Sequence, residues 1–354
     1  MSPPFVPGVE LSGLLYREAV QPLLSHHFPG LAYTAALIGP GSEVLGFDTE
    51  RSTDHNWGPR LQLFLRKDDH AAHGSRLDDV LAEALPPTVA GYPIGLATVD
   101  DPGTRHGVVV TELGDWLTGQ LGFDPGVGIT TGDWLATPTQ ALAELTAGVV
   151  HHDGLGRLHR VRDALAWYPD DLWRYVLACQ WRRISQEEAF VGRCGEVGDE
   201  LGSAIVAARL VRDLMRLCLL INRTYPPYSK WLGSAFRRLP CADELGPVLA
   251  AAVGATSWPE RERHLTAAYP TVAGLHNGLG LTEPVDARVR PFHDRPFQVL
   301  DAERFATALV GGITDRAVRE LPPTGAVDQF VDNTDVLEWV ERTSAVSNAL
   351  YGSG

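Results

Sequence analysis

The sequence predicts an α+β protein in which an N-terminal domain with a mixed β-sheet precedes an α-helical domain. Short apolar segments typical of strands alternate with helical segments up to about residue 137, and long apolar repeats at helical spacing follow. The chain has 354 residues, of which 44% are hydrophobic and 21% charged, enough for two domains with their own cores. We expect domains over 1–137 and 138–275, and a C-terminal extension over 276–354 that packs on both.

The N-terminal domain is expected to contain two helices and three strands. Leucine and valine recur at helical spacing over residues 10–27, and the sequence His-His-Phe-Pro-Gly ends this first helix. A second helix is expected over 77–85. Apolar segments bounded by glycine and proline predict the strands, over 33–39, 61–65 and 106–112.

The second domain is expected to be built from helices alone. Apolar residues at helical spacing predict helices over 140–150, 157–167, 171–190 and 199–223, with a shorter one through Trp231. The C-terminal extension is rich in proline and glycine at first, and then contains one strand-like segment, 297–300, and two more helices.

Charge and composition disfavour several classes of partner. The chain has 30 basic and 44 acidic residues and a formal net charge of -14, which fits an extended nucleic acid poorly. No segment approaches the ~20 apolar residues of a membrane span, and the first residues lack the basic-then-apolar order of a signal peptide. The four cysteines form no C-x-x-C pair, which favours reduced thiols. We therefore expect a cytoplasmic protein without a membrane or nucleic-acid partner; the sequence does not indicate its oligomeric state.

Residues 39–65 form the most unusual segment of the chain. Gly41 and Ser42 follow an expected strand, so backbone N–H groups and a hydroxyl could hold phosphate oxygens there. A tight turn without any ligand has the same signature and is the commoner case when nothing accompanies it. Here Asp54 and Asn56 follow and lead into the next expected strand, where side chains two residues apart share one face.

This order of strand, Gly-Ser turn and acidic pair resembles the nucleotidyltransferase superfamily, which includes polymerase beta-like enzymes and aminoglycoside nucleotidyltransferases. Gly41 and Ser42 match the turn, and Asp54 and Asn56 match the acidic pair. An uncharacterised bacterial family within that superfamily is similar over four stretches: GSEVLGFDTERSTDHNWGPRLQLFL, WRRISQEEAFVGRCGEVGDELGS, YSKWLGSAF and VDQFVDNTDVLEW. The resemblance implies a nucleotidyltransferase-like N-terminal domain on a mixed sheet.

The resemblance also implies an activity. A Mg²⁺-dependent enzyme of this kind moves a nucleoside monophosphate, here AMP from ATP, to a hydroxyl or amine of a small acceptor molecule. One or two Mg²⁺ ions activate the acceptor and neutralise the leaving pyrophosphate, so Asp54 and Asn56 are the expected metal ligands. Glu112, at the end of a neighbouring strand, is the expected third ligand, or else an ordinary strand-end glutamate. His55 is expected to contact a phosphate, or else to be a core histidine bonded to the backbone.

Residues of the helical domain complete the expected site. Related enzymes place lysine and hydroxyl side chains from their helical half on the β- and γ-phosphates, so the resemblance implies this role for Ser229 and Lys230. The alternative for Lys230 is a helix-end lysine that interacts with the helix dipole. Glu187 or Glu188, of which we select Glu188, is the candidate general base for the acceptor. An intrahelical ion-pair face with Arg182 and Arg183 is the simpler explanation of this segment.

Three alternatives remain open. Asn56 brings no charge to a metal, which motivates a catalytically degenerate protein that binds a nucleotide or a partner without turnover. An ATP-using biosynthetic enzyme that activates a carboxylate is compatible with the same fold. Finally, His-His-Asp at residues 151–153, together with His159, resembles the metal-binding doublet of helical phosphohydrolases, although these residues could simply end a helix.

Overall fold

The computed structural model describes residues 3–54, 57–94 and 106–352. It is a mixed α/β structure with 58% helix and a mixed four-stranded sheet. The chain divides into two compact units, one formed by Met1–Asp133 and Ala141–Trp167 and the other by Trp134–Gln140 and Tyr168–Gly354. Within the described ranges, every helix is too short or too polar to cross a membrane.

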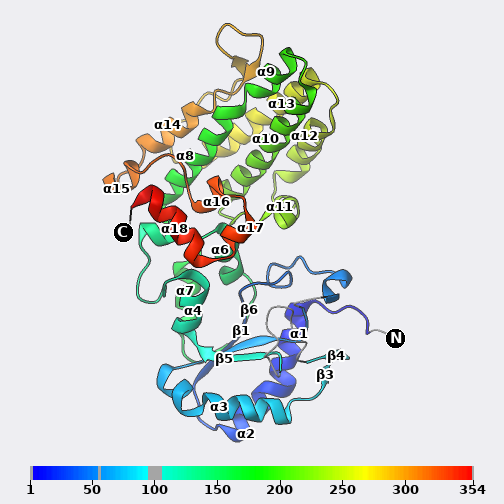
Figure 1. The fold of residues 1–354 in the computed structure, drawn as a ribbon, viewed down its shortest axis with the longest axis vertical. Coiled ribbons are helices and arrows are strands. Elements are labelled where there is room, and N and C mark those ends of the chain that lie inside the picture. Colours follow the sequence, from blue (N-terminus) through cyan, green and yellow to red (C-terminus); the bar gives the residue numbers. More distant parts are fainter. Residues whose placement is uncertain (1–2, 55–56, 95–105, 353–354) are drawn as a thin grey trace. The chain divides into compact units, whose positions relative to one another are not determined.

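The first unit is organised around the four-stranded sheet, whose strand order is β5-β2-β1-β6 (Figure 1). β1 pairs antiparallel with both β2 and β6, whereas β2 and β5 are parallel. Residues 134–140, at the end of α5 and the start of α6, belong to the second unit. The elements up to residue 167 are, in chain order, α1(Gly8–Leu15), the π-helical turn η1(Tyr16–Val20), α2(Gln21–His27), β1(Tyr33–Leu37), the 3-10 turn η2(Glu50–Asp54), β2(Leu61–Leu65), α3(Lys67–Ala84), β3(Thr88–Val89), β4(Tyr92–Pro93), β5(Val108–Glu112), α4(Leu113–Leu121), α5(Thr131–Ala136), α6(Thr139–Thr146), β6(Val149–Asp153) and α7(Arg157–Ala164).

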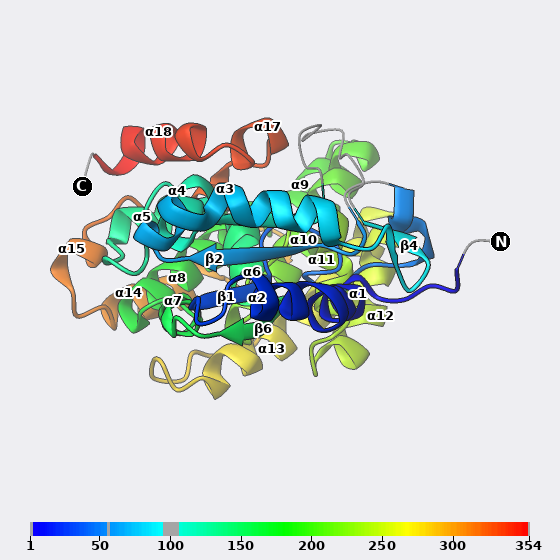
Figure 2. The same cartoon turned by 90° about the horizontal axis from the view of Figure 1, so that it is seen from below.

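Helices α1 to α3 cover one face of this sheet. Figure 2 shows α2 and α3 lying in front of β1 and β2 when the unit is viewed from below. Leu15 and Leu24 of the N-terminal helix share one buried cluster with Leu77 of α3 and with Leu61 and Leu63 of β2. On the opposite face, Phe64 contacts Trp116 of α4, with ring centroids 5.4 Å apart. All five residues of β2 are buried, which explains its continuous apolar sequence.

Over its described residues, the second unit is helical apart from two paired strands of two residues each. Helices α8, α10 and α13 lie side by side, with α14 against α8 (Figure 1). Its elements are α8(Asp170–Glu187), α9(Phe190–Glu196), α10(Glu200–Ile221), α11(Ser229–Phe236), α12(Ala242–Gly254), α13(Trp258–Gly278), β7(Arg290–Pro291), β8(Gln298–Val299), α14(Glu303–Gly311), α15(Arg316–Arg319), α16(Val327–Phe330), α17(Thr334–Leu337) and α18(Val340–Tyr351).

A fully buried tryptophan joins three helices of this unit. Trp181 of α8 stacks on Phe305 of α14 with a centroid separation of 4.5 Å, and its Nε1–H donates to Nδ1 of His276 on α13 over 3.1 Å. Burial lowers the pKa of His276 to about 4. The ring is therefore neutral at neutral pH and can accept the tryptophan hydrogen bond.

The helix at 10–27 and the strands beginning at 33 and 61 are confirmed, but the start of the expected helical domain is different. The helix expected over 140–150 ends at Thr146, and residues 149–153 form β6, which pairs with β1. Gly148 separates the two elements: its φ is +69°, and a Cβ there would lie 2.1 Å from the Leu37 carbonyl oxygen. Residues 141–167 thus belong to the first unit. The helix expected over 77–85 also begins earlier, at Lys67.

Candidate functional site

The Gly-Ser turn lies where β1 ends and β2 begins. Because these strands are antiparallel, the residues that follow Leu37 lie beside the chain that enters Leu61. The Gln62 side chain fixes this end of the pair: its Oε1 accepts from the Ile38 N–H over 3.1 Å, and its Nε2 donates to the Ile38 carbonyl over 3.0 Å. The turn is therefore held by the sheet itself.

Because Gly41 has no side chain, the Arg60 guanidinium can lie close to its backbone. A Cβ at this position would lie 2.3 Å from Nη2 of Arg60 and 2.8 Å from Oε2 of Glu43. No other residue type fits without moving these groups. The glycine that the sequence suggested for phosphate binding thus also permits the close approach of a guanidinium.

Two carboxylates of the loop after Ser42 hold it to its surroundings. Glu43 is fully buried, and its Oε1 accepts from Nε of Arg60 over 2.7 Å. Asp48 Oδ2 accepts from the backbone N–H of Gly8 over 2.8 Å and from Nε1 of Trp57 over 3.0 Å. A carboxylate at the N-terminus of α1 is favourable because it meets unpaired N–H groups and the positive end of the helix dipole. These contacts give the turn a defined scaffold.

The expected acidic pair is described only in part. Asp54 is the last residue of η2, and β2 begins at Leu61, so the expectation that Asp54 stands on a strand is wrong. Its side chain, together with His55 and Asn56, lies outside the described residues. Among the side chains that are described, no group of three or more His, Cys, Asp or Glu residues could hold a metal ion. The metal-binding role of Asp54 and Asn56 stays a prediction.

Glu112 lies at the other end of the sheet from the Gly-Ser turn. The parallel register pairs Leu61 with Val108 and Leu65 with Glu112, which places Glu112 four residues, or about 13 Å, beyond the turn end of β2. Its Oε2 accepts from the Asp115 N–H over 2.7 Å as the N-cap of α4, and its Oε1 pairs with Arg157 over 2.6 Å. The structure thus gives Glu112 a capping role and does not bring it to the expected metal site.

Ser229 and Lys230 open helix α11 in the second unit. Both are exposed, and the Lys230 ammonium lies over the ring of Trp231, 4.7 Å from its centroid. A lysine at a helix N-terminus faces the positive end of the dipole, so the helix dipole does not stabilise it. Lys230 is a helix-end lysine, as the alternative expected, but the cation–π contact and not the dipole is the stabilising interaction that the structure shows.

Glu188 is a buried anchor at the C-terminus of α8. Its Oε2 accepts from the N–H groups of Leu300 over 2.8 Å and Asp301 over 3.1 Å, and its Oε1 accepts from Ala302 over 2.9 Å. Burial raises the pKa of Glu188 to about 7, although these three hydrogen bonds act in the opposite direction. Because three donors occupy most of its acceptor positions, the general-base role expected for Glu188 gains no support.

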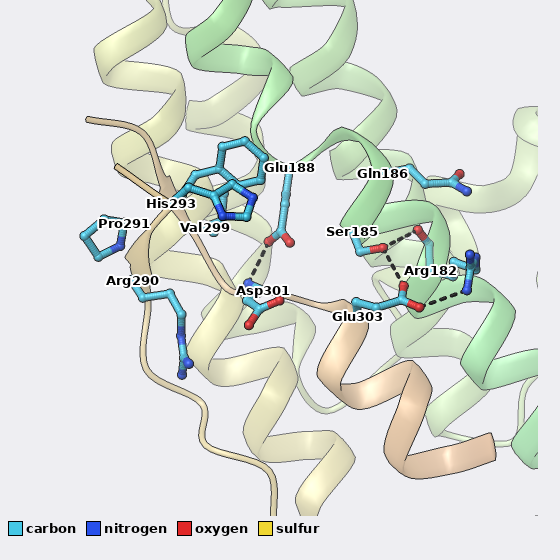
Figure 3. A pocket seen from close by; sticks show the side chains of 11 residues that line it. Arg182, Ser185, Gln186, Glu188, Arg290, Pro291, His293, Val299, Asp301 and Glu303 are labelled. Atoms are coloured by element: carbon cyan, nitrogen blue, oxygen red, sulfur yellow. Dashed lines mark hydrogen bonds and ion pairs between the residues drawn. The ribbon is translucent and has the colours of Figure 1, made fainter. Parts of the chain in front are cut away.

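A pocket of about 470 Å³ adjoins this carboxylate on the second unit (Figure 3). Its walls carry charges of both signs, but most are already paired: Arg182 bonds Glu303 over 2.9 Å, and Ser185 donates to the same carboxylate over 3.0 Å. Asp301, which also lines the pocket, has a positive φ of 61°. The pocket wall is thus a strained turn held in place by hydrogen bonds and ion pairs.

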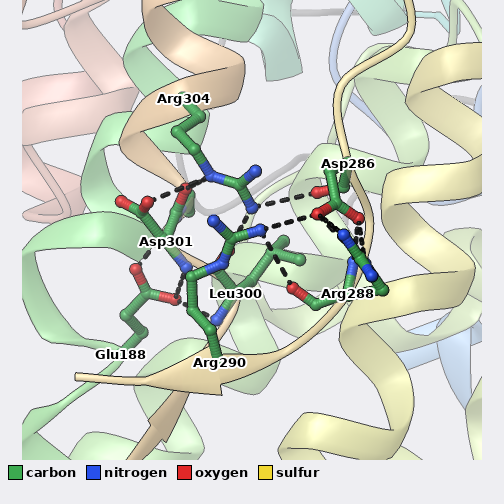
Figure 4. A network of polar contacts seen from close by, with 8 residues as sticks. Glu188, Asp286, Arg288, Arg290, Leu300, Asp301 and Arg304 are labelled. Carbon is green, nitrogen blue, oxygen red and sulfur yellow. Dashed lines mark hydrogen bonds and ion pairs between the residues drawn. The ribbon is translucent and has the colours of Figure 1, made fainter. Parts of the chain in front are cut away.

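The arginines beside the pocket stabilise that turn. Arg304 pairs with the Asp301 carboxylate over 3.0 Å and donates to the Leu300 carbonyl over 2.7 Å (Figure 4). Arg288 and Arg290 both pair with Asp286, over 3.0 and 3.1 Å. These arginines are engaged with the chain itself, so the network explains how the segment before α14 is fixed.

The His-His-Asp sequence lies on strand β6, and the expectation that it ends a helix is wrong. Oγ of Ser12 bonds Nε2 of His151 over 2.9 Å, and burial lowers the pKa of His151 to about 4. Burial acts to raise the pKa of Asp153, but hydrogen bonds from Thr34 and His159 outweigh it and hold that pKa below its ordinary value. These contacts are structural and give no support to a phosphohydrolase site.

The sequence reasoning missed Glu43 and Arg60. The available signal was the antiparallel pairing of the two predicted strands, because it places the residue before the second strand beside the residues after the first. Arg60 precedes β2 and Gly41 follows β1, so their proximity follows from that pairing.

Comparison with known proteins adds one match. A family model described as a domain of unknown function (DUF4037) matches residues 134–232. This segment includes Glu188, Ser229 and Lys230, whereas the Gly-Ser turn lies outside it. No curated protein and no solved structure matches the chain.

Proposed function

We propose that the Gly-Ser turn of the first unit binds the triphosphate of a nucleotide, and that the protein is a Mg²⁺-dependent nucleotidyltransferase. It would move AMP from ATP to the hydroxyl or amine of a small acceptor. The observation that carries the proposal is the position of Gly41 and Ser42: they leave β1 beside the chain that enters β2, with Asp54 a few residues upstream on that chain. The resemblance of this order to nucleotidyltransferases supports the same conclusion.

The residues that would hold Mg²⁺ fit that ion, though with fewer charges than expected. Asp54 offers a carboxylate and Asn56 an amide oxygen, both hard donors of the type that Mg²⁺ takes together with phosphate oxygens and water. Glu112 is too far along the sheet to complete the set. When bound, Mg²⁺ would neutralise charge on the phosphates. This donor set suits one ion better than two.

In the proposed reaction, the acceptor oxygen or nitrogen attacks the α-phosphorus of ATP. The bond from that phosphorus to the bridging oxygen breaks, pyrophosphate leaves, and the acceptor's proton passes to water. Backbone N–H groups at Gly41 and the Ser42 hydroxyl would orient the phosphates. Orientation and charge neutralisation are the main contributions that this chemistry requires of a protein.

One observation favours a second candidate, a protein of the same fold that binds a nucleotide without turnover. Strand β5 carries Val108, Val109, Val110 and Thr111 before Glu112, so its turn end offers no carboxylate. Because Asn56 is uncharged as well, Asp54 is the one carboxylate left among the expected metal ligands. A protein that only binds a nucleotide needs no second metal ion.

Binding and turnover can be tested separately. Calorimetry should show Mg·ATP binding, and ATP at 100 times its dissociation constant should raise the free energy of unfolding by about 2.7 kcal/mol. Asp54→Ala should abolish the metal-dependent part of binding, whereas Asp68→Ala, at an exposed position in α3, should not. An Asp54→Ala variant that binds Mg·ATP like the parent would show that the metal site is elsewhere.

Release of pyrophosphate from ATP, measured with mixtures of small alcohols and amines, then distinguishes the two candidates. The enzyme releases pyrophosphate in the presence of an acceptor, and the degenerate protein does not. Asn56→Asp should strengthen metal binding in either case, because it restores an anion to the expected site. If Asn56→Asp weakens binding of Mg·ATP instead, the amide has a role of its own.

A further inference from the structure

A guanidinium is fixed against the Gly-Ser turn. Nη2 of Arg60 donates to the Pro40 carbonyl over 2.6 Å and lies within 2.6 Å of Oε1 of Glu43, and Nε donates to the same oxygen over 2.7 Å. The guanidinium therefore contacts the turn on both sides of Gly41, whose missing side chain makes room for it.

The donor hydrogens of Arg60 are only partly used. A guanidinium carries five N–H donors. The Nε hydrogen and the two on Nη2 meet Glu43 and Pro40, while Nη1 makes no hydrogen bond or ion pair within the part of the chain that the structure describes. The Arg60 side chain is 28% exposed, whereas that of Glu43 is 0% exposed. Two donors on a partly exposed, oriented cation are thus left for a ligand.

Stability alone does not account for the pair. Oε2 of Glu43 is buried and has no hydrogen-bond partner among the described residues, and leaving a buried acceptor unpaired costs about 1–3 kcal/mol. Burying an ion pair also costs desolvation energy that the attraction between the charges barely offsets. The arrangement is better explained if Glu43 serves to orient the guanidinium.

We propose that Arg60 is a phosphate-binding residue whose Nη1 donors contact the polyphosphate held by the Gly-Ser turn, and that Glu43 is its positioning residue. This rests on the proposed function, since it places the nucleotide triphosphate at that turn. Because Glu43 balances the charge of Arg60, the contribution comes mainly from directed hydrogen bonds. The geometry of the guanidinium, and not only its charge, therefore matters.

The competing explanation is that Arg60 only braces the loop. Arg60→Lys separates the two, because a lysine ammonium can still pair with Glu43 but has no second nitrogen to offer a phosphate. If Arg60 only holds the loop in place, Arg60→Lys should keep the polyphosphate affinity of the parent. If Arg60 binds the polyphosphate, the same variant should lose affinity.

The experiment measures binding of sodium tripolyphosphate to the full chain by calorimetry, in EDTA so that no metal contributes, and then binding of Mg·ATP. We expect Arg60→Ala to weaken tripolyphosphate binding at least tenfold and Arg60→Lys at least threefold, with the melting temperature of the lysine variant unchanged. Arg66→Ala is the matched control: Arg66 directly follows β2 as Arg60 directly precedes it, is exposed, and should change the affinity less than twofold.

The outcomes separate this inference from the proposed function. Parent-like tripolyphosphate affinity in Arg60→Lys or Arg60→Ala overturns the inference, even if Mg·ATP binding shows that the proposed function is right. Loss of tripolyphosphate binding in both Arg60 variants, but not in Arg66→Ala, supports the inference even if Mg·ATP adds no metal-dependent binding and the nucleotidyltransferase proposal fails. A parent protein that binds neither tripolyphosphate nor Mg·ATP overturns both.

Discussion

Protonation of Glu188 should make the stability of the second unit depend on pH. This carboxylate is only 6% exposed and receives three backbone N–H groups from residues 300–302, which connect β8 to α14. It thereby links the end of α8 to the start of α14 (Figure 4). Burial is the largest cause of the raised pKa of Glu188, and repulsion from the neighbouring Asp301 carboxylate raises it further.

The size and sign of the effect follow from linkage. The pKa of Glu188 is 4.5 ordinarily and about 7 in the folded protein. Between these two values the folded state binds more protons than the unfolded state, so the free energy of unfolding falls as pH rises through this window. A shift of one unit corresponds to about 1.4 kcal/mol, so the full loss is about 3 kcal/mol, and the contribution is constant above pH 7 and below pH 4.5.

Urea unfolding followed by tryptophan fluorescence at a series of pH values from 4.5 to 8 measures this dependence. Glu188→Gln has no titrating proton, so its free energy of unfolding should fall about 3 kcal/mol less than that of the parent across the window. Gln186→Ala is the control: this uncharged, exposed side chain lines the same pocket and carries no titrating proton, so its variant should keep the parent slope.

The comparison of slopes also accounts for other groups. Burial raises the pKa values of Glu187 and Glu262 as well, so the parent slope contains their contributions, and these persist in the variant. Equal slopes for the parent and Glu188→Gln between pH 4.5 and 7 would refute the reasoning. In that case the three backbone donors outweigh burial and hold the carboxylate ionised.

The remaining predictions concern stability. Gly148→Ala should lower the free energy of unfolding by more than about 1 kcal/mol, since its φ is +69° and its Cβ would meet a carbonyl oxygen. Gly274→Ala, at an exposed position inside α13 with open space around it, should instead raise the free energy of unfolding by up to about 1 kcal/mol. Urea unfolding measures both. Leu63→Ala should cost about 2–5 kcal/mol, because Leu63 is fully buried in the sheet core, and a smaller loss would show that the site collapses around the cavity. Arg216→Met should cost about 3–5 kcal/mol in the same assay, because it leaves the buried Asp328 carboxylate without its 3.0 Å ion pair. A loss below 1 kcal/mol would show that this ion pair adds little to the stability of the fold.

Much of the first unit was predictable because its core strands have unambiguous patterns. β2 is buried along its whole length and reads as a continuous apolar run, and the helix before β1 shows apolar residues on one face. β6 was missed because it is an edge strand with two histidines and an aspartate, a short segment in which helical and strand periods cannot be distinguished. The glycine at 148 was the signal that a helix could not continue through it.

The position of Glu112 could not be obtained from local sequence. A glutamate at the end of a strand lies near the Gly-Ser turn only if that strand runs antiparallel to β2. The structure shows the parallel arrangement, which sends the C-terminal end of β5 to the opposite edge. Strand direction depends on the connection between the two strands and on tertiary packing, and the sequence around residue 112 does not indicate either.

Glu43 and Arg60 illustrate a different limit. They are 17 residues apart, and each looks like an ordinary charged residue next to a turn or a strand. They become neighbours only because β1 pairs antiparallel with β2. The Arg60 guanidinium has a fixed orientation because the carboxylate that it pairs with, Glu43, is fully buried. The glycine in the motif then has two consequences: it exposes backbone N–H groups for a phosphate, and it leaves room for the guanidinium beside them. If the turn holds a polyphosphate, the two functions are inseparable, because any side chain at residue 41 would displace the arginine as well as block the backbone.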